Sequence, residues 1–192
     1  MPSASPVRPA RRDPGAAAGQ TIVVDFDTPN AAGYSFTAGT ISTALGTSGN
    51  GATPAGNTSI YGYVSSAVAP AFATLSTPNL RSISFYWGSI DAFYSLDVLG
   101  AGGSLLTTIT GAVLPPDNGN QFLPSTNRRI FITAGLGEVI TGLTFRSSGV
   151  AYEFDTIAAS AVPEPQAWAL LIAGFGMVGA AARRRRTAAI SA

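Results

Sequence analysis

Short runs of alternating apolar and polar residues fill the chain between residues 20 and 160. The clearest run is residues 80–87 (LRSISFYW), in which Ile83, Phe85 and Trp87 alternate with two serines and a tyrosine. A period of two is typical of a strand that buries one face. Similar but weaker patterns predict further strands at residues 21–26, 34–37, 59–64, 71–75, 93–98, 104–110, 129–133, 139–145 and 151–157.

Turn-forming residues separate these predicted strands. Residues 101–103 (AGG) predict a tight turn between the strands at 93–98 and 104–110, because glycine readily adopts the positive φ angles of such turns. Residues 46–57 and 114–127 are rich in Gly, Pro and Asn and predict two long, exposed loops. No helical period precedes residue 161. The sequence therefore predicts an all-β fold for residues 20–160, an antiparallel β-sandwich of jelly-roll-like type.

The C-terminal end has a different pattern with three parts. Residues 163–165 (PEP) fix an extended backbone, residues 167–182 carry no charge, and residues 183–186 are four arginines. A helix over residues 167–182 would be about 24 Å long, slightly less than a ~30 Å hydrocarbon core. A buried core helix is the alternative. The glycines of this run and the terminal arginines favour a single transmembrane helix with its arginines on the cytoplasmic side.

The order and spacing of these residues resemble the PEP-CTERM sorting signal, in its Trp-Ala variant. The matching motif residues are Pro163, Glu164, Pro165, Trp168 and Ala169, followed by Arg183, Arg184, Arg185 and Arg186 as the stop-transfer cluster. The resemblance implies export, transient residence in the inner membrane and processing by exosortase. It further implies a final location at the cell surface or outside the cell, in bacteria that make exopolysaccharide and biofilm. Two segments, SFYWGSIDAFYSLDVL and AYEFDTIAAS, more loosely resemble ectodomains that precede this signal.

These patterns divide the chain into four predicted parts. Residues 1–19 form an N-terminal segment, residues 20–160 the ectodomain, residues 161–186 the sorting signal, and residues 187–192 a cytoplasmic tail. The first part has arginines and small residues but lacks the apolar stretch of a signal peptide. We interpret it as a degenerate or mis-called signal peptide and expect the mature chain to begin near Gly19 or Gln20.

Composition excludes several kinds of site. The chain has no cysteine and no histidine, which removes disulfides, thiolate metal ligands and the usual general base at neutral pH. Residues 20–160 carry eight carboxylates against four arginines, and this acidic balance argues against nucleic acid as a partner. Composition therefore favours a non-enzymatic protein without a required cofactor, and the resemblance implies that it is a surface or matrix protein.

Two kinds of side chain keep other functions open. Carboxylates could support a glycoside hydrolase, and three of them, Asp25, Asp27 and Asp155, are weak candidates for binding calcium. Aromatic residues could stack on sugars in a carbohydrate-binding module, with Tyr86 and Phe93 facing outward. The hydrolase candidates are Asp25, Asp27, Asp91, Asp97, Glu153 and Asp155, and the aromatic residues are Tyr61, Tyr63, Phe85, Tyr86, Trp87, Phe93 and Tyr94.

Overall fold

The computed structural model describes residues 13–162, 171–179 and 183. The chain divides into two compact units, Met1–Ala161 and Val162–Ala192, and each is described by itself. The described part of the first unit is built almost entirely from strands and connecting loops. Its ten strands are β1 (Thr21–Val24), β2 (Ser35–Gly39), β3 (Ser42–Ala44), β4 (Tyr61–Val64), β5 (Phe72–Gly88), β6 (Tyr94–Leu99), β7 (Leu105–Thr110), β8 (Arg128–Thr133), β9 (Ile140–Ser147) and β10 (Tyr152–Ala161).

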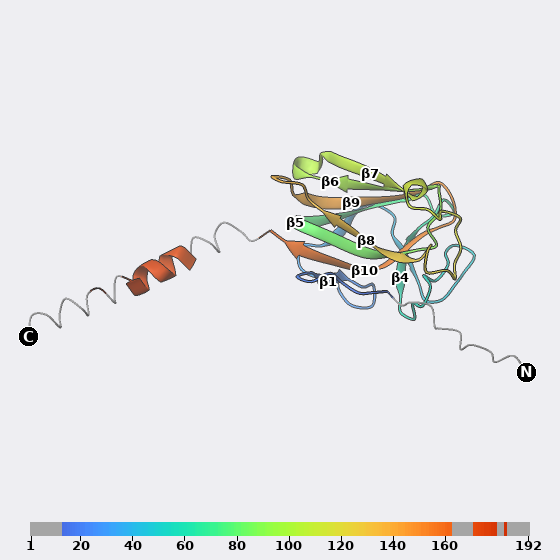
Figure 1. Ribbon diagram of the computed structural model, residues 1–192. Coiled ribbons are helices and arrows are strands. Elements are labelled where there is room, and N and C mark those ends of the chain that lie inside the picture. The colour runs from blue at the N-terminus through green and yellow to red at the C-terminus, as the bar shows by residue number, and fades with distance from the viewer. Residues whose placement is uncertain (1–12, 163–170, 180–182, 184–192) are drawn as a thin grey trace, which may run out of the picture. The chain divides into compact units, whose positions relative to one another are not determined.

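One long strand, β5, joins two layers of antiparallel strands (Figure 1). Its first part, Phe72–Ser76, pairs with β2 and β9, and β9 continues the layer through β6 to β7. Its second part, from Ser82 onward, pairs with β8 on one side and with β10 on the other. β10 in turn pairs with β1 and β4, and β3 pairs with β4. The first unit is thus a mostly antiparallel β-sandwich.

The change of partners along β5 coincides with Pro78. Proline has no N–H to donate to a ladder, and the register between β5 and β9 shifts between Ser76 and Leu80. The sequence predicted two strands, at residues 71–75 and 80–87, and this was wrong because one strand runs through both. The prediction nevertheless marked the place where the strand passes from one layer to the other.

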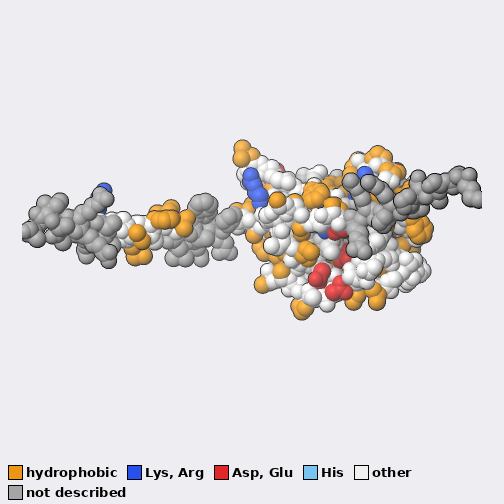
Figure 2. Space-filling model, turned by 60° about the horizontal axis from the view of Figure 1, so that its bottom comes forward, with side chains coloured by type: hydrophobic (Ala, Val, Ile, Leu, Met, Phe, Trp, Pro, Cys, Tyr) orange, Lys and Arg blue, Asp and Glu red, His pale blue; other side chains and the backbone are white. Residues whose placement is uncertain are grey.

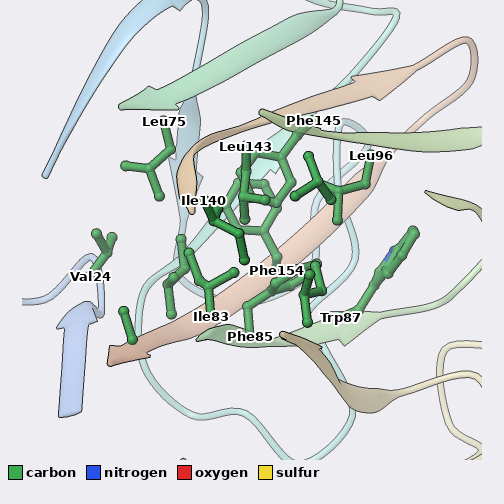
Figure 3. Packing of buried hydrophobic residues seen from close by; sticks show 14 of the residues in the cluster. Val24, Leu75, Ile83, Phe85, Trp87, Leu96, Ile140, Leu143, Phe145 and Phe154 are labelled. Atoms are coloured by element: carbon green, nitrogen blue, oxygen red, sulfur yellow. The ribbon is translucent and has the colours of Figure 1, made fainter. Parts of the chain in front are cut away.

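The core fills the space between the layers (Figure 3). Leu75, Leu96, Leu143 and Phe145 from one layer face Ile83, Phe85, Trp87 and Phe154 from the other, and all are fully buried. The rings of Phe145 and Phe154 stack with centroids 3.9 Å apart, and Phe85 meets Phe145 edge-on at 5.5 Å. These contacts confirm the alternation predicted for residues 80–87, whose apolar side chains all point inward.

Other predictions from the pattern had mixed outcomes. The turn at residues 101–103 is confirmed, with positive φ at Gly102 and Gly103 between β6 and β7. Strand β3 was not predicted. The loop over residues 46–57 was expected to be exposed. Residues 46–50 and 56 are exposed, but the expectation was wrong for Gly51, Ala52, Pro54 and Ala55, which are buried. The jelly-roll connectivity stays a prediction.

In the second unit, residues 171–179 form an α-helix. Within the residues that the structure describes, no helix is long and apolar enough to cross a membrane. The transmembrane helix expected over residues 167–182 extends beyond the described residues at both ends, so it stays a prediction.

Candidate functional site

Two carboxylates lie side by side on β10, on the outer face of the layer that β10 forms with β1, β4, β8 and the second part of β5. Tyr152 and Phe154 point into the core, so the alternation of β10 sends Glu153 and Asp155 to the opposite face. Both carboxylates are nevertheless buried, with exposed fractions of 1% and 2%. This face of the strand is not solvated, because the chain folds back over it.

Glu153 holds the start of the covering segment, residues 51–59. One carboxylate oxygen accepts the backbone N–H of Ala52 at 2.7 Å, and the other accepts the Ser89 hydroxyl at 2.6 Å. Burial raises the pKa of Glu153 to about 7, although these two hydrogen bonds act in the opposite direction. A buried carboxylate whose two oxygens are bonded by neutral donors is costly to ionise.

Asp155 holds the end of the same segment. Its Oδ2 atom accepts the Asn57 amide at 2.8 Å and the Ser59 hydroxyl at 3.1 Å, while Oδ1 accepts the Thr156 N–H at 2.6 Å. Burial raises the pKa of Asp155 to about 6, and the nearby charge of Asp27 adds to the shift.

Further contacts tie residues 51–59 to the sheet. The Asn127 side chain accepts the backbone N–H of Ala55 at 2.9 Å, and the Tyr86 hydroxyl donates to the Ala55 carbonyl at 2.8 Å. Gly88 leaves room for Pro54, since a Cβ there would lie 2.9 Å from the proline ring. The segment is therefore an ordered cover, which we call the β10 cover (residues 51–59).

A buried ion pair completes this face. Arg129 on β8 has no exposed side-chain surface and bonds Asp13 through two nitrogens, at 2.7 and 2.5 Å. The same guanidinium donates to Ser84 and to the Thr156 hydroxyl. Burial raises the pKa of Asp13, but the hydrogen bonds from Arg129, Gly15 and Thr156 outweigh it and the pKa is lowered overall. Asp13 is thus part of the folded unit, and the start of the mature chain near residue 19 or 20 stays a prediction.

A cavity of about 290 Å³ lies between the β10 cover, Asp13 and the sheet. We call it the Asp155 pocket. Figure 2 shows one face of the molecule, on which acidic side chains gather. Asp155, Tyr86 and Arg129 form one row across β10, β5 and β8, and the first two of them line the pocket. The side chains of its wall belong to Asp13, Asn57, Thr58, Tyr86, Asp155 and Thr156.

The calcium candidates do not converge. Asp25 follows β1 and binds the backbone N–H groups of Asp27 and Thr28 in a tight turn, while Asp27 accepts the Ile60 N–H at 3.2 Å. Among the described residues, no group of three or more acidic side chains is placed to hold a metal ion.

Of the remaining hydrolase candidates, Asp97 pairs with an arginine and Asp91 lies near Glu153. Asp97 on β6 pairs with Arg146 at 2.9 Å, and Asp91 accepts the Ala92 N–H in the turn before β6. A second, smaller cavity of about 160 Å³ is lined by Asp91, Ser89 and Glu153.

The aromatic residues are mostly structural. Tyr61, Phe85, Trp87 and Tyr94 are buried. Tyr86 was expected to face outward, but it is only 3% exposed because the β10 cover lies over it. Phe93 is 36% exposed and packs edge-on against Tyr94. The described residues therefore present no row of exposed aromatic rings on a strand.

The boundary between the two units coincides with the start of a recognisable sequence motif. Residues 161–186 match the family model described as the PEP-CTERM protein-sorting motif. The chain carries a PEP-CTERM sorting motif. The motif begins where the compact β unit ends, at Ala161. It implies an exported protein that exosortase processes and that is delivered to the cell surface.

Comparisons of the whole chain found only remote similarity. No curated protein gave a match. Among solved structures, the enzymatically active domain of tailspike protein 4 from bacteriophage CBA120 is 13% identical, with a TM-score of 0.35, over 76% of this chain and 20% of that chain. The family 11 carbohydrate-binding module of the cellulase Lic26A-Cel5E from Clostridium thermocellum is 15% identical, with a TM-score of 0.34, over 78% of this chain and 98% of that chain. The chain spans only a fifth of the tailspike chain.

Within the PEP-CTERM motif, the five predicted motif residues and Arg184, Arg185 and Arg186 lie outside the described residues, while Arg183 is described and exposed. Sequence reasoning found the motif but missed Asp13, Asn57 and Arg129. No local pattern links these three residues, because the fold brings them together from distant parts of the chain.

Proposed function

We propose that this chain is an exported, non-enzymatic protein of the cell surface or extracellular matrix. The observation that carries the proposal is the PEP-CTERM motif at residues 161–186, directly after a compact β-sandwich. In this proposal the sandwich is displayed at the cell surface, and the motif is recognised by exosortase. In this proposal a helix over residues 167–182 spans the inner membrane before processing, and the arginines after it stay in the cytoplasm.

The non-enzymatic part of the proposal is supported by the available side chains. The chain has no histidine and no cysteine, so the common nucleophile and base pairs cannot be built. Glu153 has a raised pKa, as a general acid requires, but it is 1% exposed and both of its oxygens are engaged. A carboxylate-dependent glycoside hydrolase is therefore the weaker alternative.

The test is substitution of Glu164, the only charged residue between Asp155 and Arg183. In a host with exosortase, Glu164→Ala should leave membrane insertion intact but block processing, because the enzyme loses a charge-assisted contact. Full-length protein should then accumulate in the inner-membrane fraction, where immunoblotting detects it. Glu138→Ala is the matched control, since Glu138 lies on an exposed turn of the sandwich.

Two outcomes would count against the proposal. If Glu164→Ala is processed at the wild-type rate, the motif acts only as an anchor. If the wild-type protein is released equally in a host without exosortase, the sorting function is wrong.

One observation favours a second candidate function, a carbohydrate-binding module of the surface matrix. The Asp155 pocket is lined by several polar side chains, which can bond the hydroxyl groups of a sugar. This candidate would connect the displayed sandwich with exopolysaccharide and biofilm.

A further inference from the structure

One end of the β-sandwich is the end from which the chain leaves toward the PEP-CTERM motif. Ala161, the last residue of β10, pairs with Leu80 of β5, which in turn pairs with Ile140 at the start of β9. The turn between β8 and β9 therefore lies at this end. The turn between β6 and β7 lies there too, because the end of β6 pairs with the start of β9 and with Leu105 of β7 (Figure 1). We call this region the exit end (residues 78–81, 100–105, 134–138 and 161).

Two neighbouring turns of the exit end expose leucine side chains. Leu136 is 100% exposed at the tip of the turn between β8 and β9. The Glu138 N–H closes this turn on the Gly135 carbonyl at 3.1 Å, and the Glu138 carboxylate accepts the Gly135 N–H at 3.1 Å. Leu105 is 60% exposed directly after the turn between β6 and β7. A single exposed leucine needs no explanation, but two beside the exit of the chain form a small apolar contact surface.

The charges of the exit end suit a phospholipid surface. Its charged side chains are Arg81 and Glu138, which balance each other, and the Arg81 carbonyl accepts the Ala134 N–H beside the turn that carries Leu136. The opposite end, formed by the loops before β6 and β8, carries Asp91 and Asp117. An anionic leaflet repels carboxylates and attracts arginine. The exit end is therefore the end that can approach such a leaflet.

The length of the chain keeps the exit end close to the membrane. In the proposed function a membrane helix begins at residue 167, so only residues 162–166 separate it from Ala161. At ~3.3–3.6 Å per residue, this connection spans at most about 20 Å. A tether of this length holds a contact surface at an effective concentration in the ~millimolar range. A contact that would be too weak for a free protein can then form.

Other partners fit the exit end poorly. A stable interface with a second copy buries about 800 Å² on each partner, and two leucine side chains supply only a small part of that area. A sugar would find no aromatic ring among the residues of the exit end. Lipid requires only shallow apolar tips and a cation, because arginine keeps its charge among the phosphates while leucine enters the region of the acyl chains.

We propose that, before processing, the exit end rests on the outer surface of the inner membrane. Leu136 and Leu105 enter the lipid interface, and Arg81 lies among the lipid phosphates. The inference rests on the proposed function, because the membrane helix supplies the tether. Its consequence is that residues 163–165 are held at the lipid surface, where a membrane-embedded exosortase acts. Processing removes the tether and so releases the contact.

Site-directed fluorescence tests the proposal on the full-length chain in nanodiscs of phosphatidylcholine and phosphatidylglycerol. The chain contains no cysteine, so Leu136→Cys introduces the one attachment point for the fluorophore NBD. A nitroxide on the upper part of the lipid acyl chains quenches fluorophores that reach this depth. The label at position 136 should lose roughly half of its fluorescence when the quencher lipid is present. An unquenched label on a chain that stays in the nanodisc overturns the proposal.

Phe122→Cys is the matched control for the position of the label. Phe122 is 79% exposed on the loop before β8, at the end of the sandwich opposite to the exit end. A label at this position should keep its full fluorescence in the same nanodiscs. Equal quenching at positions 122 and 136 would show that the sandwich has no preferred end toward lipid, and it would overturn the assignment.

A third label measures the contribution of the leucine itself. Leu105→Cys carries the fluorophore, and Leu136→Glu is added as a second change. The new carboxylate should reduce quenching at position 105 at least twofold, whereas Phe122→Glu should leave it unchanged. Both glutamates stand at exposed positions, and circular dichroism shows whether the sandwich is intact. Unchanged quenching in the Leu136→Glu variant would mean that Leu136 makes no contact with lipid.

The proposed function and this inference fail in different ways. If the chain does not copurify with the nanodiscs, the expected membrane helix is wrong and the inference fails with it. If the chain copurifies and is processed by exosortase while position 136 stays unquenched, the proposed function holds and only the contact with lipid is wrong.

Discussion

The burial of Glu153 predicts an unusual dependence of stability on pH, which Glu153→Gln should remove. The carboxyl group has a pKa of about 7 in the folded chain against an ordinary value of 4.5. Because the folded pKa is raised, the folded chain binds a proton more tightly than the unfolded chain. The stabilisation from Glu153 is therefore complete below about pH 4.5 and is lost as the pH rises through about 7.

The size of the effect follows from linkage. Between pH 5 and pH 8 the free energy of unfolding should fall by about 2.5 kcal/mol because of Glu153 alone. Asp155, whose pKa is raised to about 6, should remove a further ~1.5 kcal/mol over the same range. A glutamine at position 153 can accept the Ala52 N–H and donate to the Ser89 hydroxyl, so it keeps both contacts without a charge.

The assay is urea unfolding of the full-length chain, followed by circular dichroism at pH 5, 6, 7 and 8. Glu153→Gln should lose only about 1.5 kcal/mol between pH 5 and pH 8, and at pH 8 it should be more stable than the wild-type chain. Glu138→Gln makes the same chemical change on an exposed turn and should follow the wild-type profile. Parallel profiles for the wild-type chain and Glu153→Gln would refute the reasoning, because Glu153 would then have no raised pKa in the fold.

Two further predictions concern the ends of the folded unit and its close backbone contacts. Asp13→Ala should lower the free energy of unfolding by about 2–4 kcal/mol, measured by urea unfolding at pH 7, because it leaves the Arg129 guanidinium buried without its anion. An unchanged midpoint would show that residues before Gln20 do not belong to the fold. Gly111→Ala should destabilise the chain strongly, since a Cβ there would lie 1.8 Å from the Asp91 carbonyl oxygen, whereas Gly49→Ala meets no atom within 4 Å and should be close to neutral by thermal unfolding.

The fold could be predicted from the sequence as far as local pattern determines it. The alternation of residues 80–87 gave both a strand and its buried face, and the glycines at 102 and 103 gave a hairpin. Strand β3 was not predicted because it has only three residues, Ser42–Ala44, and these show no clear alternation. The continuity of β5 through Pro78 was not predicted because proline usually ends a strand. Only the pairing of β5 with its neighbouring strands shows that the strand continues.

The functional features also differ in how far the sequence could predict them. The PEP-CTERM motif is contiguous, so its order and spacing can be read directly from the chain. The Asp155 pocket is not contiguous, because Asp13, Asn57 and Asp155 come from three distant segments. Gly- and Asn-rich composition predicted a loop at residues 46–57, but composition does not tell whether such a loop is solvated or folded over a sheet. In this chain the loop folds over the sheet because it bonds residues about a hundred positions away, as in the hydrogen bond from Ala52 to Glu153.

The two buried carboxylates make the fold less stable near neutral pH, so a purely structural explanation of them is insufficient. Leucine or glutamine at position 153 or 155 would avoid the cost of ionising a buried group. What these carboxylates provide is position. Glu153 fixes the start of the β10 cover and Asp155 fixes its end through Asn57, and this places Thr58 at the wall of the pocket. A pocket whose wall is rigid loses little entropy when a ligand binds. The lost stability is therefore best explained by the arrangement of the pocket, while the core of the sandwich supplies the stability that remains.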